Sequence, residues 1–115
     1  MSKTTKYNFP DAKRGDTYND VSFTINVNSA PQDLTGANIR MWLIDASQQI
    51  PAGDFNTVNG KLIITNAAAG VFKTNVGIVT LQPAQYYYDI QITFTNGTIK
   101  TWIEGTLTVL DDLTK

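Results

Sequence analysis

The side chains that could do chemistry in this chain are few and scattered. Its ten carboxylates are spread over 115 residues, and none stands in an acid–base or metal-ligand spacing. The four serines, Ser2, Ser22, Ser29 and Ser47, have no usual catalytic partner, because the sequence contains no histidine. It contains no cysteine either, so thiolate nucleophiles, thiolate metal ligands and disulfides are excluded. The composition predicts a protein that is not an enzyme and that has no cofactor or metal.

Two short motifs have a functional and a plainer interpretation. Asp111-Asp112 could bind a hard cation, but adjacent acids in a tail are usually solvated. Arg14-Gly15-Asp16 is the tripeptide of some integrin ligands, and here it is interpreted as the opening of the first full strand. Nothing matches an EF-hand loop, a P-loop or a nucleophile elbow. We therefore expect function to lie in binding.

Charge and hydropathy exclude two classes of partner. Nine basic and ten acidic residues give a net charge of −1, which offers no electrostatic reason to bind nucleic acid or an anionic membrane. No stretch approaches the roughly 20 apolar residues of a membrane-spanning helix. The sequence predicts neither nucleic acid nor membrane as a partner.

The pattern of the chain predicts one all-β domain. Residues 1–14 are interpreted as an N-terminal arm with a possible short strand at Tyr7 and Phe9, residues 15–112 as the domain, and residues 113–115 as a tail. Alternation of apolar and polar residues predicts about seven short strands with turns between them and no helix, which is typical of an antiparallel, Greek-key, immunoglobulin-like β-sandwich. The expected strands include Val21–Val27, Ala37–Asp45, Lys61–Thr65, Val71–Val76 and a long hairpin over Ala84–Val109, and Gln48–Gly60 is interpreted as a loop.

The hairpin has a predicted register. Asn96-Gly97 favours a two-residue type I′ turn, which fixes the pairing of the two arms. The expected core face pairs Phe94 with Ile99, Ile92 with Thr101, Ile90 with Ile103 and Tyr88 with Gly105. The expected outer face pairs Thr93 with Lys100, Gln91 with Trp102, Asp89 with Glu104 and Tyr87 with Thr106.

The outer face supplies the candidate interface. If Ala37–Asp45 lies beside the hairpin, an aromatic patch rimmed by charge results, as in protein interfaces, and Arg40 could neutralise the opposed acids. Alternatively, loops or the N-terminal arm cover the rings, or a cation lies between the two acids. Tyr7 and Phe9 join the candidate set because the arm either is tied down as a strand or docks on a neighbouring subunit. The candidate residues are Arg40, Trp42, Ile44, Tyr87, Asp89, Trp102, Glu104, Tyr7 and Phe9.

One motif concerns stability alone. Pro83 with Tyr86 or Tyr88 is typical of a tyrosine corner, in which the hydroxyl bonds to backbone upstream. The alternative is an ordinary strand tyrosine.

Four segments, taken in order, resemble a known family. They are Phe9 with Lys13–Thr17, then Asp33–Ala37, then Ala68–Phe72, then Tyr86–Ile90 continuing through Asn96-Gly97 to Thr101 and Gly105–Val109. This set is similar to the N-terminal immunoglobulin-like domain of phage baseplate upper proteins and the small phage structural proteins built on it. Ala84-Gln85-Tyr86 stands where that family often has Gly-x-Tyr.

The resemblance implies a virion protein made in the host bacterial cytoplasm, in tail, baseplate or head. Its partners would be other virion proteins, and it would form a homo-oligomer or a symmetric array. In baseplate proteins a coiled coil follows this domain, and its absence before Lys115 favours an adaptor, connector or decoration role over receptor binding. The alternative is a carbohydrate- or host-surface-binding module, which requires Trp42 and Trp102 to be coplanar and open to solvent.

Overall fold

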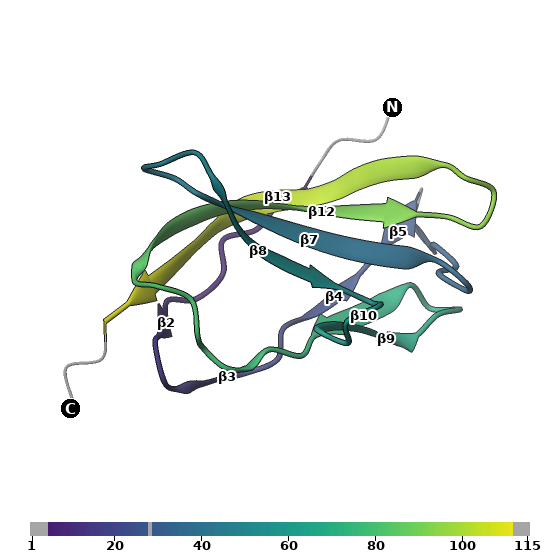
Figure 1. Ribbon diagram of the computed structural model, residues 1–115. Coiled ribbons are helices and arrows are strands. Elements are labelled where there is room, and N and C mark those ends of the chain that lie inside the picture. The colour runs from purple at the N-terminus through teal and green to yellow at the C-terminus, as the bar shows by residue number, and fades with distance from the viewer. Residues whose placement is uncertain (1–4, 28, 112–115) are drawn as a thin grey trace.

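Two β-sheets pack face to face in the computed structural model, which describes residues 5–27 and 29–111 (Figure 1). The front sheet has the order β1 (Thr5–Lys6), β13 (Ile99–Leu110), β12 (Ala84–Thr93), β7 (Asn38–Asp45) and β8 (Pro51–Asn56), and β2 (Ala12–Lys13) also pairs with β13. The back sheet has the order β4 (Ser22–Thr24), β10 (Val71–Thr74) and β9 (Leu62–Asn66). Two short pairs complete the fold: β11 (Gly77–Ile78) with β3 (Thr17–Tyr18), and β5 (Asn26–Val27) with β6 (Ala30–Pro31).

The strand order is that of an immunoglobulin-like sandwich. In such a sandwich the third, sixth and seventh strands form one sheet, and the second, fifth and fourth form the other. Here β7, β12 and β13 take the first set of places and β4, β10 and β9 the second, while β8 extends the front sheet beside β7. The predicted all-β immunoglobulin-like sandwich is confirmed.

Alternation along the strands places the core as the sequence predicts. On β7 the side chains of Ile39, Met41 and Leu43 are buried, and on β12 those of Ile90 and Ile92 are buried. The residues between them on each strand turn to the opposite face, because successive side chains of a strand point in opposite directions. The front sheet therefore has one apolar inner face and one outer face on which polar and apolar residues are mixed.

A strand replaces the loop that was predicted over Gln48–Gly60. β8 pairs antiparallel with β7, with Arg40 opposite Asn56 and Trp42 opposite Asp54. Pro51 and Gly53 are typical of loops, which is why the sequence pattern does not indicate a strand here. Proline is tolerated there because it is the first residue of an edge strand, where no partner needs its missing N–H.

The strand predicted over Val21–Val27 is interrupted at Ile25. The Ile25 N–H donates to the Gly70 carbonyl at 2.8 Å, and the Ile25 carbonyl accepts from the Gln32 N–H at 2.9 Å. These bonds to two different segments divide the stretch into β4 and β5. They also require Gly70, because a Cβ there would lie 2.6 Å from the Ile25 carbonyl oxygen.

The N-terminal arm is part of the sandwich. β1 and β2 run parallel to β13, whereas the other paired strands are antiparallel. The Tyr7 N–H donates to the Glu104 carbonyl, and the Phe9 N–H to the Thr106 carbonyl, both at 2.9 Å. Residues 5–13 thus lie along β13 of their own chain. The arm does contain short strands, but they lie at Thr5–Lys6 and Ala12–Lys13 and not at Tyr7 and Phe9, where the sequence predicts one. Because residues 5–13 lie on their own chain, docking of this part of the arm on a neighbouring subunit is not what the structure shows. Residues 1–4 and 113–115 lie outside the described residues.

The tyrosine corner is present at Tyr86. Its hydroxyl donates at 2.5 Å to the carbonyl of Gln82, which lies two residues before the start of β12. The Tyr88 hydroxyl instead donates to the Tyr7 carbonyl and so ties the arm to the sheet.

Candidate functional site

The outer face of the front sheet brings six of the predicted interface residues together. Strand register places Tyr87 beside Ile44 and Asp89 beside Trp42, and it places Glu104 beside Asp89 on the other side. Tyr87 is 49% exposed, whereas Trp42 and Ile44 are half-buried. We use the name outer face for the set Arg40, Trp42, Ile44, Tyr87, Asp89 and Glu104.

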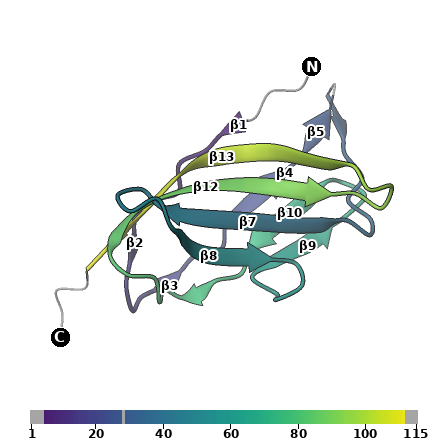
Figure 2. The same cartoon turned by 45° about the horizontal axis from the view of Figure 1, so that its top comes forward.

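No described segment of the chain covers the outer face. In Figure 2, β13, β12, β7 and β8 lie side by side as the layer nearest the viewer, with the back sheet behind them. β1 extends this layer at the edge of β13 and does not cross it. Among the alternatives left open by the sequence, coverage by the described part of the arm is therefore wrong.

Arg40 has a different partner from the one expected. Its guanidinium forms a bidentate ion pair with Asp54, with Nη2–Oδ2 at 2.7 Å and Nε–Oδ1 at 3.1 Å. It also lies 4.2 Å above the Trp42 ring. Since both acceptor oxygens belong to Asp54, Arg40 does not neutralise the pair Asp89 and Glu104. The sequence missed Asp54 because its strand was interpreted as a loop, although Asp54 and Asn56 flank the apolar Phe55.

The opposed acids form the middle of a row across the sheet. Lys6, Glu104, Asp89, Trp42 and Asp54 are successive register partners on five adjacent strands. Burial raises the pKa of the Asp89 carboxyl, and the nearby charge of Glu104 raises it further. Ionised Asp89 therefore lowers the stability of the folded chain.

Asp89→Asn is expected to stabilise the protein at pH 7 by a few tenths of a kcal/mol, the usual cost of like charges on adjacent strands. The pKa of Asp89 is higher in the folded than in the unfolded protein. The free energy of unfolding is therefore highest below the unfolded-state pKa, where Asp89 is protonated, and it falls as the pH rises through the folded-state pKa. The gain from Asp89→Asn should therefore vanish at about pH 3. Urea unfolding at both pH values measures it.

Asp54→Asn is the matched control, because the Arg40 hydrogen bonds hold the pKa of Asp54 below its usual value. Its effect has the opposite sign: a loss of stability at pH 7 that disappears on acidification. If both variants changed the free energy of unfolding at pH 7 in the same direction, the opposite effects assigned to the Asp89 and Asp54 charges would be contradicted.

Trp102 is not on the outer face. The side chain is only 9% exposed and turns inward, with its ring 6.5 Å from that of Phe94 and the Lys100 ammonium 4.4 Å above it. Its Nε1 is buried and has no hydrogen-bond partner in the described structure. The predicted place of Trp102 in the exposed patch is therefore wrong.

Two local irregularities in the hairpin turn Trp102 inward. The loop has three residues: Gly97 donates its N–H to the Phe94 carbonyl, Phe94 donates to the Thr98 carbonyl, and Gly97 has φ +88°. This is a type I turn followed by a bulge, and it moves the nearby pairing by one residue. A second bulge then leaves Trp102 without a register partner. From Ile90 opposite Ile103 outward the predicted pairing is restored.

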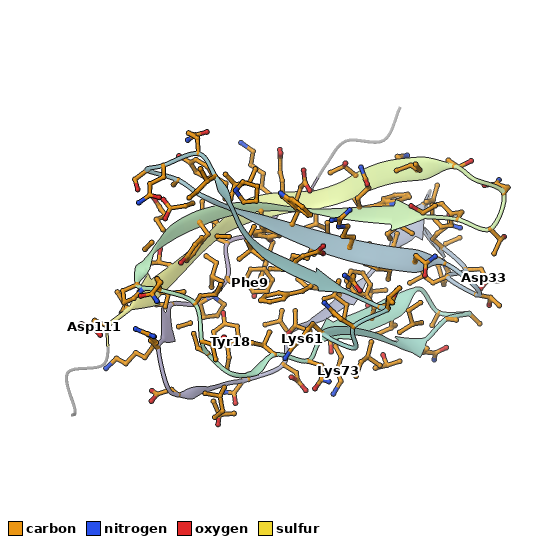
Figure 3. The ribbon with its side chains drawn as sticks, in the orientation of Figure 1. Phe9, Tyr18, Asp33, Lys61, Lys73 and Asp111 are labelled. Carbon is orange, nitrogen blue, oxygen red and sulfur yellow. The ribbon has the colours of Figure 1, made fainter. Side chains whose placement is uncertain are left out.

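Tyr7 and Phe9 pack against the core from the N-terminal arm: Phe9 is buried and Tyr7 is half-buried. Phe9 is 6% exposed, and Figure 3 shows it pointing between the two sheets. Its ring centroid lies 4.9 Å from that of Tyr88 and 5.8 Å from that of Phe23. Tyr7 packs edge-on against both Phe9 and Phe23. Phe9 is buried, so its prediction as a contact residue is wrong. Tyr7 is half-buried and helps to hold the arm to the core, and its contact role stays a prediction.

The other motifs show no second site among the described residues. Arg14-Gly15-Asp16 forms the exposed turn between β2 and β3, with Gly15 at φ +93°. Asp112 lies outside the described residues, and no group of three or more acids, histidines or cysteines within them could hold a metal ion. The described part of the chain also has no helix of the length and apolarity needed to cross a membrane.

Comparison with known proteins adds likenesses of fold. No protein-family model matches the chain, and no curated protein matches it. Among solved structures, CopC from Methylosinus trichosporium OB3b is similar over 91% of this chain and 88% of its own, with a TM-score of 0.49 and 8% identity. Murine CRIg is similar over 90% of this chain and 91% of its own, with a TM-score of 0.36 and 12% identity. At such identities a likeness concerns the fold alone.

Proposed function

We propose that this chain is a non-enzymatic binding domain that docks other proteins on its outer face. The observation that carries the proposal is the exposed Tyr87 beside Trp42 and Ile44 on a sheet face that no described segment covers. Arg40 stacked on Trp42 and the acids Asp89 and Glu104 supply a polar rim. Aromatic residues and arginine within such a rim are typical of protein interfaces.

The sequence resemblance supports the setting: a structural protein of a tailed-phage virion, arranged as a homo-oligomer or a symmetric array. A rigid sandwich with a sheet face turned outward suits repetition by symmetry, because one patch can then serve every copy. A glycan-binding module is the weaker candidate. It needs two open tryptophan rings, and Trp102 is buried.

Tyr87→Glu is expected to lower incorporation of the chain into purified particles at least about tenfold, as for a hot-spot residue. The particles are prepared from cells that encode the chain, and its copy number is measured by quantitative mass spectrometry. Val58→Glu is the matched control, because Val58 is 85% exposed in the turn between β8 and β9. Absence of the wild-type chain from particles would contradict the virion setting, and full incorporation of Tyr87→Glu would contradict the outer face as the contact.

A further inference from the structure

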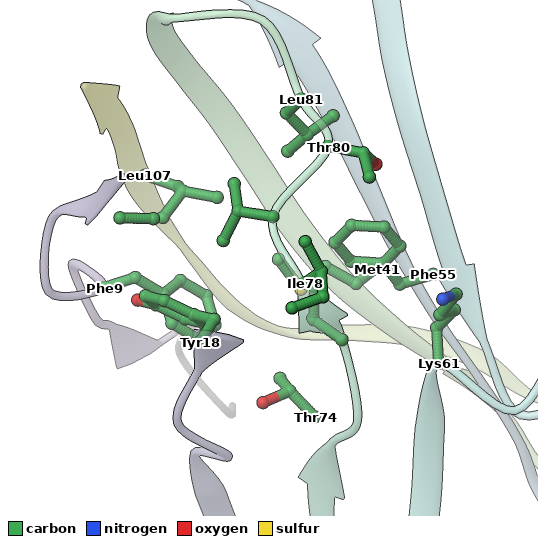
Figure 4. A pocket seen from close by; sticks show the side chains of 13 residues that line it. Phe9, Tyr18, Met41, Phe55, Lys61, Thr74, Ile78, Thr80, Leu81 and Leu107 are labelled. Atoms are coloured by element: carbon green, nitrogen blue, oxygen red, sulfur yellow. The ribbon is translucent and has the colours of Figure 1, made fainter. Parts of the chain in front are cut away.

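A hollow opens at the end of the sandwich where the chain crosses from β10 to β12 (Figure 4). It has a volume of about 80 Å³. Its floor includes Phe9, Met41, Val79 and Leu107, all of them buried core residues. The hollow is therefore continuous with the apolar core, and none of its lining residues belongs to the outer face.

The backbone that shapes this hollow is fixed by hydrogen bonds. The Val79 N–H donates to the Asp16 carbonyl, and the Val79 carbonyl accepts from the Gly15 N–H, both at 2.9 Å. These bonds hold the crossover segment against the turn between β2 and β3, away from β7. The space between the crossover and β7 is thus built into the fold, so a ligand would need no rearrangement to enter it.

The hydroxyls of Tyr18 and Thr74, which line the hollow, already have partners. The Tyr18 hydroxyl donates to the Pro10 carbonyl at 2.6 Å, and the Thr74 hydroxyl accepts from the Val21 N–H at 2.9 Å. Burial raises the pKa of Tyr18 to about 12, so its hydroxyl stays neutral. The remaining wall is mainly hydrocarbon, which favours an apolar occupant.

The volume limits the size of that occupant. An apolar cavity of about 150 Å³ in another protein binds benzene, which has six carbons. The hollow of about 80 Å³ is about half that size, so it fits an aliphatic chain of about three carbons. A larger ring would not fit below the rim.

The rim adds a charge and an exposed apolar side chain. Ile78 is 54% exposed at the mouth, and Figure 4 shows Lys61 at one side of the hollow and Phe9 and Tyr18 at the other. The ion pairs within the described residues are Arg40–Asp54 and Lys73–Asp20, so neither engages Lys61. An ammonium at the mouth of a hydrocarbon hollow is complementary to a carboxylate that carries a short alkyl chain.

We infer that this hollow is a binding site for a short aliphatic carboxylate, with the alkyl chain on Val79, Met41 and Leu107 and the carboxylate at Lys61. The site shares no residue with the outer face, so its test does not depend on whether the proposed function is correct. Its affinity should rise about fourfold for each methylene until the hollow is full, the equivalent of ~0.8 kcal/mol per group. Beyond four to five carbons the gain should stop.

Titration of the full chain with sodium acetate, butanoate and hexanoate, followed by amide and methyl NMR, tests the inference. The expected result is saturable shifts at Ile78, Val79 and Thr80, with butanoate binding about 15-fold more tightly than acetate by the methylene increment. Hexanoate should bind little better than butanoate. Equal affinity for acetate and butanoate, or shifts that do not saturate, would overturn the inference.

Two surface variants separate the head group from the tail. Lys61→Met should weaken butanoate binding about threefold, as expected for an exposed ion pair, and leave butan-1-ol binding unchanged. Ile78→Trp should close the mouth and abolish binding of both. Lys73→Met and Ile99→Trp are the matched controls, since neither residue lines the hollow. Binding that survives Ile78→Trp, or that Lys73→Met weakens as much as Lys61→Met does, would refute the site.

Discussion

Gly105→Ala is expected to lower the free energy of unfolding by about 2–4 kcal/mol and to release the N-terminal arm from β13. A Cβ at position 105 would lie 1.9 Å from the Tyr7 carbonyl oxygen and 2.7 Å from the Tyr7 carbonyl carbon. Both are backbone atoms. The arm cannot move aside without breaking the hydrogen bonds of Tyr7 to Glu104 and of Phe9 to Thr106.

Loss of the arm removes more than two hydrogen bonds. Phe9 would leave the core, where its ring lies against Tyr88 and Phe23. Burying a phenylalanine side chain contributes about 1.5–3 kcal/mol, so this contact alone accounts for most of the expected loss. The Tyr88 hydroxyl would also lose its acceptor, the Tyr7 carbonyl, and a buried hydroxyl without a partner is costly.

Urea unfolding measures the loss of stability, and limited proteolysis with N-terminal sequencing detects the released arm. Gly53→Ala is the matched control: its Cβ would meet Leu43 and Leu81 at 3.5 Å or more, an ordinary contact. It should change stability by no more than about 0.5 kcal/mol. A Gly105→Ala protein of wild-type stability with a protected arm would contradict the account.

The role of Gly105 shows what a strand pattern leaves out. The predicted register places this glycine opposite Tyr88, and that pairing is present. The steric reason is the close approach of the arm backbone, which alternation within the hairpin cannot reveal. A glycine inside a strand is nevertheless a general sign of such an approach. Together with Phe9, it could have indicated that the arm docks on β13.

The outer face follows largely from alternation, since β7 and β12 are regular where they pair. Strand order then decides which outer residues become neighbours, and the immunoglobulin-like order predicted for β7, β12 and β13 is correct. The partner of Arg40 could not be predicted in the same way. Asp54 lies on β8, whose proline and glycine resemble a loop, and only its pairing with β7 identifies it as a strand.

The sequence predicts the hairpin register correctly from Ile90 opposite Ile103 outward but not near the loop, because Asn96-Gly97 is compatible with two kinds of loop. A two-residue loop needs φ > 0 at both positions, whereas the observed three-residue loop needs it at Gly97 alone. Local sequence does not choose between them. Burial of side chains favours the three-residue loop. The longer loop and the bulge at Trp102 together place the indole of Trp102 between the sheets and Ile99 in solvent.

Trp102→Ala is expected to lower the free energy of unfolding by about 3 kcal/mol, whereas Ile99→Ala should change it by no more than about 0.5 kcal/mol. A regular two-residue hairpin predicts the reverse, because it would place Ile99 in the core and Trp102 on the outer face. Ile99 is 59% exposed and Trp102 is 9% exposed, so the pair separates the two registers. Urea unfolding followed by circular dichroism measures both variants, since it does not depend on the indole.

Trp102→Phe distinguishes loss of packing from loss of the indole N–H. The phenyl ring keeps the contact with Phe94, and the N–H that it removes has no hydrogen-bond partner in the described structure. Removing an unsatisfied buried donor carries no penalty of its own. The loss should therefore be well below that of Trp102→Ala. If Trp102→Phe were as damaging as Trp102→Ala, the N–H would have a partner at the bulge; if Ile99→Ala were the worse variant, the bulged register itself would be wrong.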